Sequence, residues 1–289
     1  MSKAVQSANY KDIIKDIEEF YTENSISAYS PWACKTLNYK PLSVHQIREF
    51  IELQINAQKE QNQILGVFDA VNHMNRILTD NCLDNEKNLT KTLTIIDREA
   101  LIVQLRAFTK PEIEVIDAHN ETVDVNLDGN VASIKGKQPN KKIVNRTLEF
   151  SYGTGSITLE LTVPTLYKDN LINDFFKKKF KSKLGKGQKE LEKIIDKLLS
   201  EMYFVELCKY ISSLSITKGD NDSTVLLFDS SNELSQNMLI LEKLPSNIIG
   251  AISSYITDVK EYRDSFLSYT NSQDETVSLE VDANIFTGI

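Results

Sequence analysis

The stretch that decides the fold class lies near the middle of the chain and reads VNRTLEFSYGTGSITLELTV over residues 144–163. Apolar and polar residues alternate from Val144 to Phe150 and again from Ile157 to Val163, which is the period of a half-buried β-strand. The segment between these runs, Ser151 to Ser156, contains two glycines. This pattern predicts an antiparallel hairpin with a longer loop.

A second hairpin is predicted just upstream. Val123 to Leu127 alternates, Asp128-Gly129 follows, and Val131 to Ile134 is again apolar in character. An Asp-Gly pair between two such runs is a strong local hairpin signal. Asp124, Asn126 and Asp128 also copy the first half of a calcium-binding loop, but Lys135 stands where such a loop needs a bidentate glutamate. The hairpin is therefore favoured over a calcium site.

Helices are expected on both sides of this β-rich centre. Apolar residues at helical spacing, capping signals and proline positions predict the following elements: helices Asn9–Tyr21, Ser43–Ile55, Gln63–Asn81, Asp97–Thr109, Asp169–Lys181, Gln188–Ser212 and Pro245–Phe266, and short strands at Leu37–Tyr39, Val225–Phe228 and Val277–Val281. The predicted fold class is α+β, with a helical N-terminal part, central antiparallel β-hairpins, long C-terminal helices and a final strand.

The same pattern divides the chain into a helical N-terminal extension (1–30), a strand with helices (31–110), a hairpin region (111–165) and a helical region with a closing strand (166–289). We expect 31–289 to form one compact unit.

Composition and charge indicate a globular protein whose charges are unevenly distributed along the chain. Hydrophobic residues make up 41% and charged residues 26% of the 289 residues, which fits a folded domain rather than a disordered chain. The formal net charge is −8. Residues 176–197 carry nine lysines against three acids, whereas residues 219–289 carry twelve acids against three basic residues. This distribution favours docking against charged partners and disfavours a general nucleic-acid binder. Neither a secretory signal nor a membrane segment is expected.

No constellation for catalysis, metal or cofactor binding stands out. The cysteines Cys34, Cys82 and Cys208 are widely spaced and are expected to be reduced. The histidines His45, His73 and His119 show no metal-ligand spacing, and the Gly153-Thr-Gly155 and Gly185-Lys-Gly187 segments match no phosphate-binding loop. The chain is thus expected to be non-enzymatic, with no cofactor.

One basic run is the candidate docking site. Its lysines are Lys177, Lys178, Lys179, Lys181, Lys183, Lys186 and Lys189, and Phe175, Phe176 and Phe180 are interleaved with them. Such a run can contact phosphates and bases, dock an acidic protein surface, or simply hold its lysines in water while the phenylalanines anchor a helix.

Three segments together resemble the baseplate hub protein family of T4-like contractile-tailed bacteriophages. They are KTLNYKPLSV at residues 35–44 ahead of a helix, DREALIVQLRA at 97–107, and YFVELCKYISSLSI at 203–216. Leu244-Pro245 with its helix through Tyr262, and Ile285-Phe286, follow in the matching order. The segment before residue 30 lies outside the resemblance.

The resemblance implies a structural or assembly component of a contractile-tail baseplate, built in the host cytoplasm. Its partners would be other hub or wedge proteins, with nucleic acid not expected among them. The alternative is a nucleic-acid-associated viral protein that uses residues 177–189.

Overall fold

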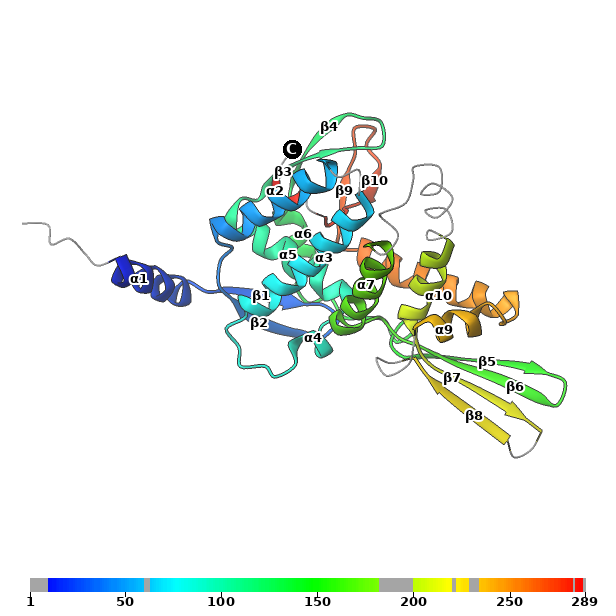
Figure 1. The fold of residues 1–289 in the computed structure, drawn as a ribbon. Coiled ribbons are helices and arrows are strands. Elements are labelled where there is room, and N and C mark those ends of the chain that lie inside the picture. Colours follow the sequence, from blue (N-terminus) through cyan, green and yellow to red (C-terminus); the bar gives the residue numbers. More distant parts are fainter. Residues whose placement is uncertain are drawn as a thin grey trace, which may run out of the picture.

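The structure is a computed structural model that describes residues 10–59, 63–181, 200–219, 222–228, 234–282 and 284–287. In chain order its elements are α1 (Tyr10–Glu23), β1 (Ile26–Ser30), β2 (Lys35–Tyr39), α2 (Val44–Lys59), α3 (Gln63–Asp80), α4 (Leu89–Thr92), α5 (Ile95–Thr109), β3 (Glu112–Ile116), β4 (Thr122–Asn126), α6 (Asp128–Ile134), β5 (Arg146–Tyr152), β6 (Gly155–Leu161), α7 (Leu166–Lys181), a helix over residues 200–210, β7 (Ile211–Lys218), β8 (Asp222–Leu227), α9 (Leu234–Leu241), α10 (Ser246–Asp264), β9 (Ser268–Thr270), β10 (Thr276–Ser278) and α11 (Asn284–Thr287). The fold is α+β, as the sequence predicts (Figure 1).

The predicted central hairpin is the β5–β6 pair of a four-stranded antiparallel sheet with the order β5-β6-β7-β8. Tyr152 pairs with Gly155, so the loop holds only two residues and is tighter than expected. Gly153 has φ +60°, which suits the first loop position of a type II′ turn. A side chain at Gly155 would meet the Thr217 carbonyl oxygen at 2.8 Å, so glycine also permits the close approach of β7.

Helix α5 runs through the main core, and the β1–β2 hairpin is fastened to it. Leu101, Ile102 and Leu105 are fully buried on α5. Thr94 and Asp97 form a capping box at its start, so the helix begins two residues earlier than predicted. The Asp97 carboxylate also accepts hydrogen bonds from the Ser30 hydroxyl at 2.6 Å and the Trp32 amide at 2.8 Å.

Strand β1 was not expected, because residues 1–30 were predicted to be a helical extension. The helix there ends at Glu23, and residues 26–30 pair along the whole of β2. Ser30 is fully buried because Asp97 satisfies its hydroxyl. A buried serine breaks the polar–apolar alternation by which a strand is recognised.

The prediction of a tight hairpin at Asp128-Gly129 is wrong. Strand β4 pairs instead with β3 upstream, and Asp128–Ile134 is helix α6. The Asn126 side chain accepts a hydrogen bond from the Asp128 amide at 2.8 Å where the strand gives way to the helix. Leu127, Asn130 and Ile134 are buried at helical spacing.

The long helix predicted to reach Ser212 ends at Tyr210 in the described part of the chain. Residues 211–218 form β7, which lies between β6 and β8. Leu214 is a buried strand residue opposite Leu159. The earlier part of that predicted helix, residues 188–199, lies outside the described residues.

The C-terminal part also differs from the prediction. Strand β10 covers only three residues, Thr276–Ser278, and the short helix α11 follows it. Helix α9 was not predicted, whereas α10 begins directly after Pro245 as expected. The Phe286 ring on α11 stacks on Phe50 of α2 with centroids 4.0 Å apart. One buried cluster accordingly reaches from Ile26 to Phe286.

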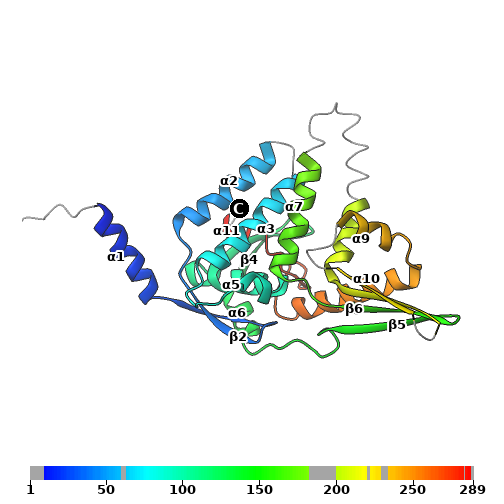
Figure 2. The ribbon, with the colours of Figure 1, turned by 60° about the horizontal axis from the view of Figure 1, so that its bottom comes forward.

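Two parts project from the body of the molecule. Figures 1 and 2 show α1 extending from the body at the start of β1, and the strands β5 to β8 extending on the opposite side. Helix α10 runs beside the sheet and is bonded to both ends of β5, through Arg146 to Asp258 at 2.7 Å and through the Tyr152 hydroxyl to Asn247 at 3.0 Å.

Candidate docking surfaces

Helix α1 carries an apolar stripe that the rest of the described chain leaves uncovered. None of its residues is buried, and only Tyr21 is half-buried. The exposed fractions of Ile13, Ile17 and Phe20 are 45%, 48% and 59%. A surface helix normally turns such a stripe toward a core, so this one is available to a partner.

The polar side of α1 is predominantly acidic. It holds five carboxylates and two lysines, namely Asp12, Asp16, Glu18, Glu19, Glu23, Lys11 and Lys15. Lys15 and Glu19 form an exposed ion pair at 3.4 Å. The sequence predicted the helix and its apolar residues, but only the structure shows that the stripe is uncovered.

The basic run begins on α7 with two of its three described lysine side chains already paired. Lys177 binds Asp69 of α3, and Lys179 binds Glu201 on the helix of residues 200–210. Lys178 is exposed. Lys181 is the last residue of α7, and its side chain lies outside the described part; Lys183, Lys186 and Lys189 lie outside it entirely.

The phenylalanines of the run anchor α7 to the protein. Phe176 is 3% exposed and its ring stacks on Phe68 of α3 at 6.1 Å. Phe175 packs against the same cluster, and the Lys179 ammonium lies 5.8 Å from its ring centroid. Phe176 is buried and Phe175 is partly buried beside it, so these two rings hold α7 against α3. The side chain of Phe180 lies outside the described part.

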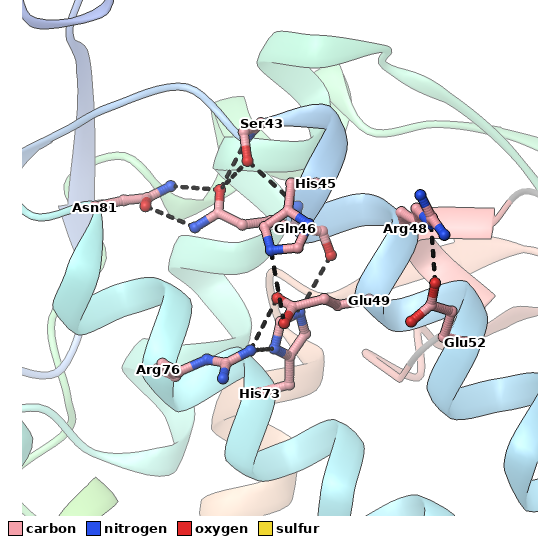
Figure 3. A network of polar contacts seen from close by, with 9 residues as sticks. All are labelled: Ser43, His45, Gln46, Arg48, Glu49, Glu52, His73, Arg76 and Asn81. Atoms are coloured by element: carbon pink, nitrogen blue, oxygen red, sulfur yellow. Dashed lines mark hydrogen bonds and ion pairs between the residues drawn. The ribbon is translucent and has the colours of Figure 1, made fainter. Parts of the chain in front are cut away.

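A network of polar contacts joins the start of α2 to α3 (Figure 3). Ser43 and Gln46 form a capping box, because the Ser43 hydroxyl accepts from the Gln46 amide at 3.2 Å while the Gln46 side chain accepts from the Ser43 amide at 3.0 Å. The Gln46 amide group also donates to the Asn81 side chain at 2.7 Å. These bonds hold the first turn of α2 against the C-terminal end of α3.

His73 lies at the centre of the second half of this network (Figure 3). The Arg76 guanidinium lies 2.7 Å from the His73 Nδ1 and 2.8 Å from the Glu49 carboxylate. Since Arg76 can only donate, the His73 Nδ1 accepts, and its Nε2–H donates to the Gln46 carbonyl at 3.1 Å.

These two hydrogen bonds therefore require the neutral form of the His73 ring. Burial lowers the pKa of His73 below its ordinary value, although the Gln46 carbonyl and the Glu49 carboxylate act in the opposite direction. Both ring nitrogens are occupied and the side chain is 3% exposed, so His73 holds α2 on α3 and has no nitrogen free for a substrate. His45, by contrast, is 79% exposed and lies 3.9 Å from Glu49.

A buried charge cluster joins three helices. Asp169 on α7 binds Arg98 of α5 at 2.6 Å and Lys209 at 2.9 Å. Burial raises the pKa of Asp169, but the charges of Lys209 and Arg98 prevail and lower it to about 2. Lys209 also pairs with Glu206, three residues before it in the sequence, at 2.7 Å. Asp169 and Arg98 carry no sequence signal, because 71 residues separate them.

The remaining candidate groups do not converge on a metal. Among the residues that the structure describes, no three His, Cys, Asp or Glu side chains are placed to hold an ion. Cys34 is exposed, Cys82 half-buried and Cys208 buried, and burial raises the pKa of the Cys208 thiol to about 12. Asn126, from the partial calcium motif, binds a backbone amide instead. No helix in the described ranges is long and apolar enough to cross a membrane.

A wide groove of about 1010 Å³ lies between residues 140–147 and α10. Its walls carry both signs of charge, with Lys141, Lys142 and Arg146 on one side and Asp258 and Glu261 on the other. Arg146 and Asp258 are paired across it. Its charges are mixed and partly paired with one another, so the groove does not present the convergent carboxylates of a carboxylate-based active site.

No protein-family model, no curated protein and no solved structure matches this chain.

Proposed function

We propose that this chain is a non-enzymatic structural or assembly component of a contractile-tail baseplate, in the hub or at the hub–wedge connection. It acts by docking to other proteins of the tail and is assembled into the baseplate in the host cytoplasm. The observation that carries the docking role is α1, a projecting helix whose apolar stripe is uncovered. A stripe of this kind is stabilised when a partner removes it from water.

The baseplate assignment is supported by the segments that resemble the hub family. Residues 35–39 form β2 and residue 44 begins α2, the strand-then-helix order that the resemblance implies. Residues 97–107 lie on α5, where Arg106 donates to the Ile285 carbonyl at 2.8 Å and so connects two of the resembling segments. The segments thus belong to one core, as parts of a single family pattern would.

Tails and their assembly intermediates test this proposal. We expect mass spectrometry of purified baseplates, or of the intermediates that precede them, to detect the chain. Ile17→Asp, which places a charge in the α1 stripe, should reduce its incorporation, whereas Thr22→Asp on the opposite side of α1 should not. Absence of the wild-type chain from both tails and intermediates would overturn the baseplate role.

The alternative, a nucleic-acid contact through residues 177–189, makes a different prediction. A salt-dependent shift of DNA or RNA in a gel, abolished by reversing the charges of Lys177, Lys178, Lys179 and Lys181, would support it. The ion pairs of Lys177 and Lys179 within the chain leave fewer free cations for phosphates, which counts against this alternative.

A further inference from the structure

Strand β8 forms one outer edge of the four-stranded sheet that projects from the body (Figure 1). It pairs with β7 in a regular antiparallel register from Asp222 to Leu227. In the part of the chain that the structure describes, no strand pairs with its other side. A strand in this position presents a row of backbone donors and acceptors with which another extended segment can pair.

The register shows which residues turn their backbone groups to this free edge. The Phe228 amide donates to the Ser212 carbonyl of β7 at 3.1 Å, so the backbone of Phe228 faces β7. Successive residues of a strand alternate between its two sides, and the pairing continues from there without a bulge. Ser223, Val225 and Leu227 therefore direct their N–H and C=O groups outward, away from β7.

The side chains of Val225 and Leu227 are apolar on a face of the sheet that is otherwise polar. Their exposed fractions are 56% and 52%. The residues that the other three strands place on this face are polar, namely Thr147, Glu149 and Ser151 of β5, Ser156, Thr158 and Glu160 of β6, and Ser213, Ser215 and Thr217 of β7. A solvated face normally carries polar residues, so a partner that removes these two side chains from water would be stabilised by them.

The opposite edge of the sheet, β5, is protected against pairing. It carries Arg146 and Glu149, and it is bonded to α10 through Arg146 and Tyr152. Charged residues and a neighbouring helix are common means of protecting an edge strand. From Ser223 to Leu227, by contrast, β8 has neither a charged residue nor a proline, and its register holds no bulge. Of the two edges, β8 is the one that can accept a further strand.

The charge around β8 selects the kind of strand that fits. Asp222 begins β8 and Asp229 follows it in the sequence, and residues 219–289 carry twelve acids against three basic residues. Two copies of this chain paired through β8 would bring these acidic regions together. A strand with basic ends avoids this repulsion and complements the acids.

We infer that the free edge of β8 binds an extended segment of another protein, which is added to the sheet beside β8. The segment carries apolar residues at alternate positions, where they cover Val225 and Leu227, and lysine or arginine at its ends. The main-chain hydrogen bonds supply affinity and the alternate side chains supply specificity. This docking site is separate from α1 and does not depend on the baseplate assignment.

Amide hydrogen exchange of the free full chain tests the geometry of the edge. The amides of Ser223, Val225 and Leu227 should exchange rapidly, whereas those of Thr224 and Leu226 should be protected by their bonds to β7. Protection of the first three amides in the free chain would overturn the inference, because the edge would then already be covered by this chain or by a second copy of it.

Selection from a display library of random dodecapeptides tests the occupant. Peptides are selected for binding to the full chain and against binding to Val225→Pro. Proline removes the outward N–H of residue 225 but no hydrogen bond to β7, so this variant should keep the fold. We expect the selected peptides to alternate apolar residues, to carry basic ends, and to protect the amides of Ser223, Val225 and Leu227 when they bind.

Val225→Lys is a second variant, which keeps the backbone N–H and places a charge at the edge. It should weaken binding of the selected peptides by at least about tenfold, whereas Val225→Ile, the matched control, should bind them like the wild type. Circular dichroism of all three variants should match that of the wild type.

A selection that yields no peptide sensitive to Val225→Lys would overturn the inference. So would a wild-type chain that dimerises in sedimentation equilibrium while Val225→Lys stays monomeric, because a second copy would then be the occupant. Either result would leave the proposed role of α1 intact, since these variants do not change α1.

Discussion

At the scale of single residues, His73 shows how a buried histidine ties stability to pH. Its folded-state pKa is lowered, with Glu49, Arg76 and His45 as the charged groups around it. A group of this kind binds protons more readily in the unfolded chain, so its contribution is complete above the unfolded pKa of about 6.5 and declines as the pH falls below it.

His73→Gln should therefore reduce the acid sensitivity of the protein. We expect the gap between the unfolding free energies of wild type and variant to narrow as the pH is lowered from about 7.5 to about 5.5. Urea unfolding at several pH values measures this gap, and His45→Gln on the exposed side of α2 is the control. A gap that does not change with pH would contradict the role assigned to His73.

Replacing the buried Asp169 should lower the free energy of unfolding more than replacing the half-exposed Glu206. Asp169→Asn leaves Arg98 and Lys209 buried without their carboxylate, and removal of one partner from a buried ion pair destabilises by about 3–5 kcal/mol. Glu206→Gln removes the half-exposed partner of Lys209 and should cost less than about 1 kcal/mol. Denaturant unfolding at neutral pH compares the two, and equal losses would show that the buried cluster contributes no more than a surface pair.

At the scale of elements, two glycines differ in whether the structure leaves room for a side chain: Gly155 has none and Gly129 has open space. Gly155 begins β6 against the Thr217 carbonyl, so Gly155→Ala should destabilise by about 1–3 kcal/mol through a forced shift of the sheet. Gly129 lies exposed in α6 with open space around it, so Gly129→Ala should stabilise by up to about 1 kcal/mol. Thermal unfolding of the two variants should move in opposite directions, and a loss of stability in both would contradict helix α6.

Elements that have a local sequence signal were predicted correctly, whereas an element that depends on a distant strand was not. The β5–β6 hairpin and α10 were predicted because alternation, glycines and Pro245 are local signals. Helix α6 was missed because an Asp-Gly pair suits a hairpin turn and a helix start alike. The choice between them depends on which strand β4 pairs with, and that partner, β3, precedes it.

At the scale of the whole molecule, the core joins the first strand to the last helix. Arg263 of α10 donates to the Leu279 carbonyl at 2.6 Å, and Arg106 of α5 holds the Ile285 carbonyl, so the C-terminal segment is fastened to two core helices. Cys208 lies in the same cluster, fully buried.

Thiol labelling can report on this core as a unit. Cys34 should react at once, because it is exposed, whereas Cys208 should react only when the molecule unfolds, since burial removes access and raises the pKa of its thiol to about 12. Its labelling rate should rise in parallel with the unfolded fraction measured by circular dichroism. Rapid labelling of Cys208 in the native protein would show that the helix of residues 200–210 opens independently of the core.

The sequence by itself determined the α+β class, most of the helices, the central hairpin and the amphipathic character of α1, because these depend on residue spacing within a few turns. Tertiary structure alone decided that Ser30 is buried, that Asp169 meets Arg98, and that the stripe of α1 is left uncovered. The physical reason is that burial is a property of what packs against a residue. For Ser30 and Asp169 that partner lies far away along the chain, and for α1 no described part of the chain supplies one.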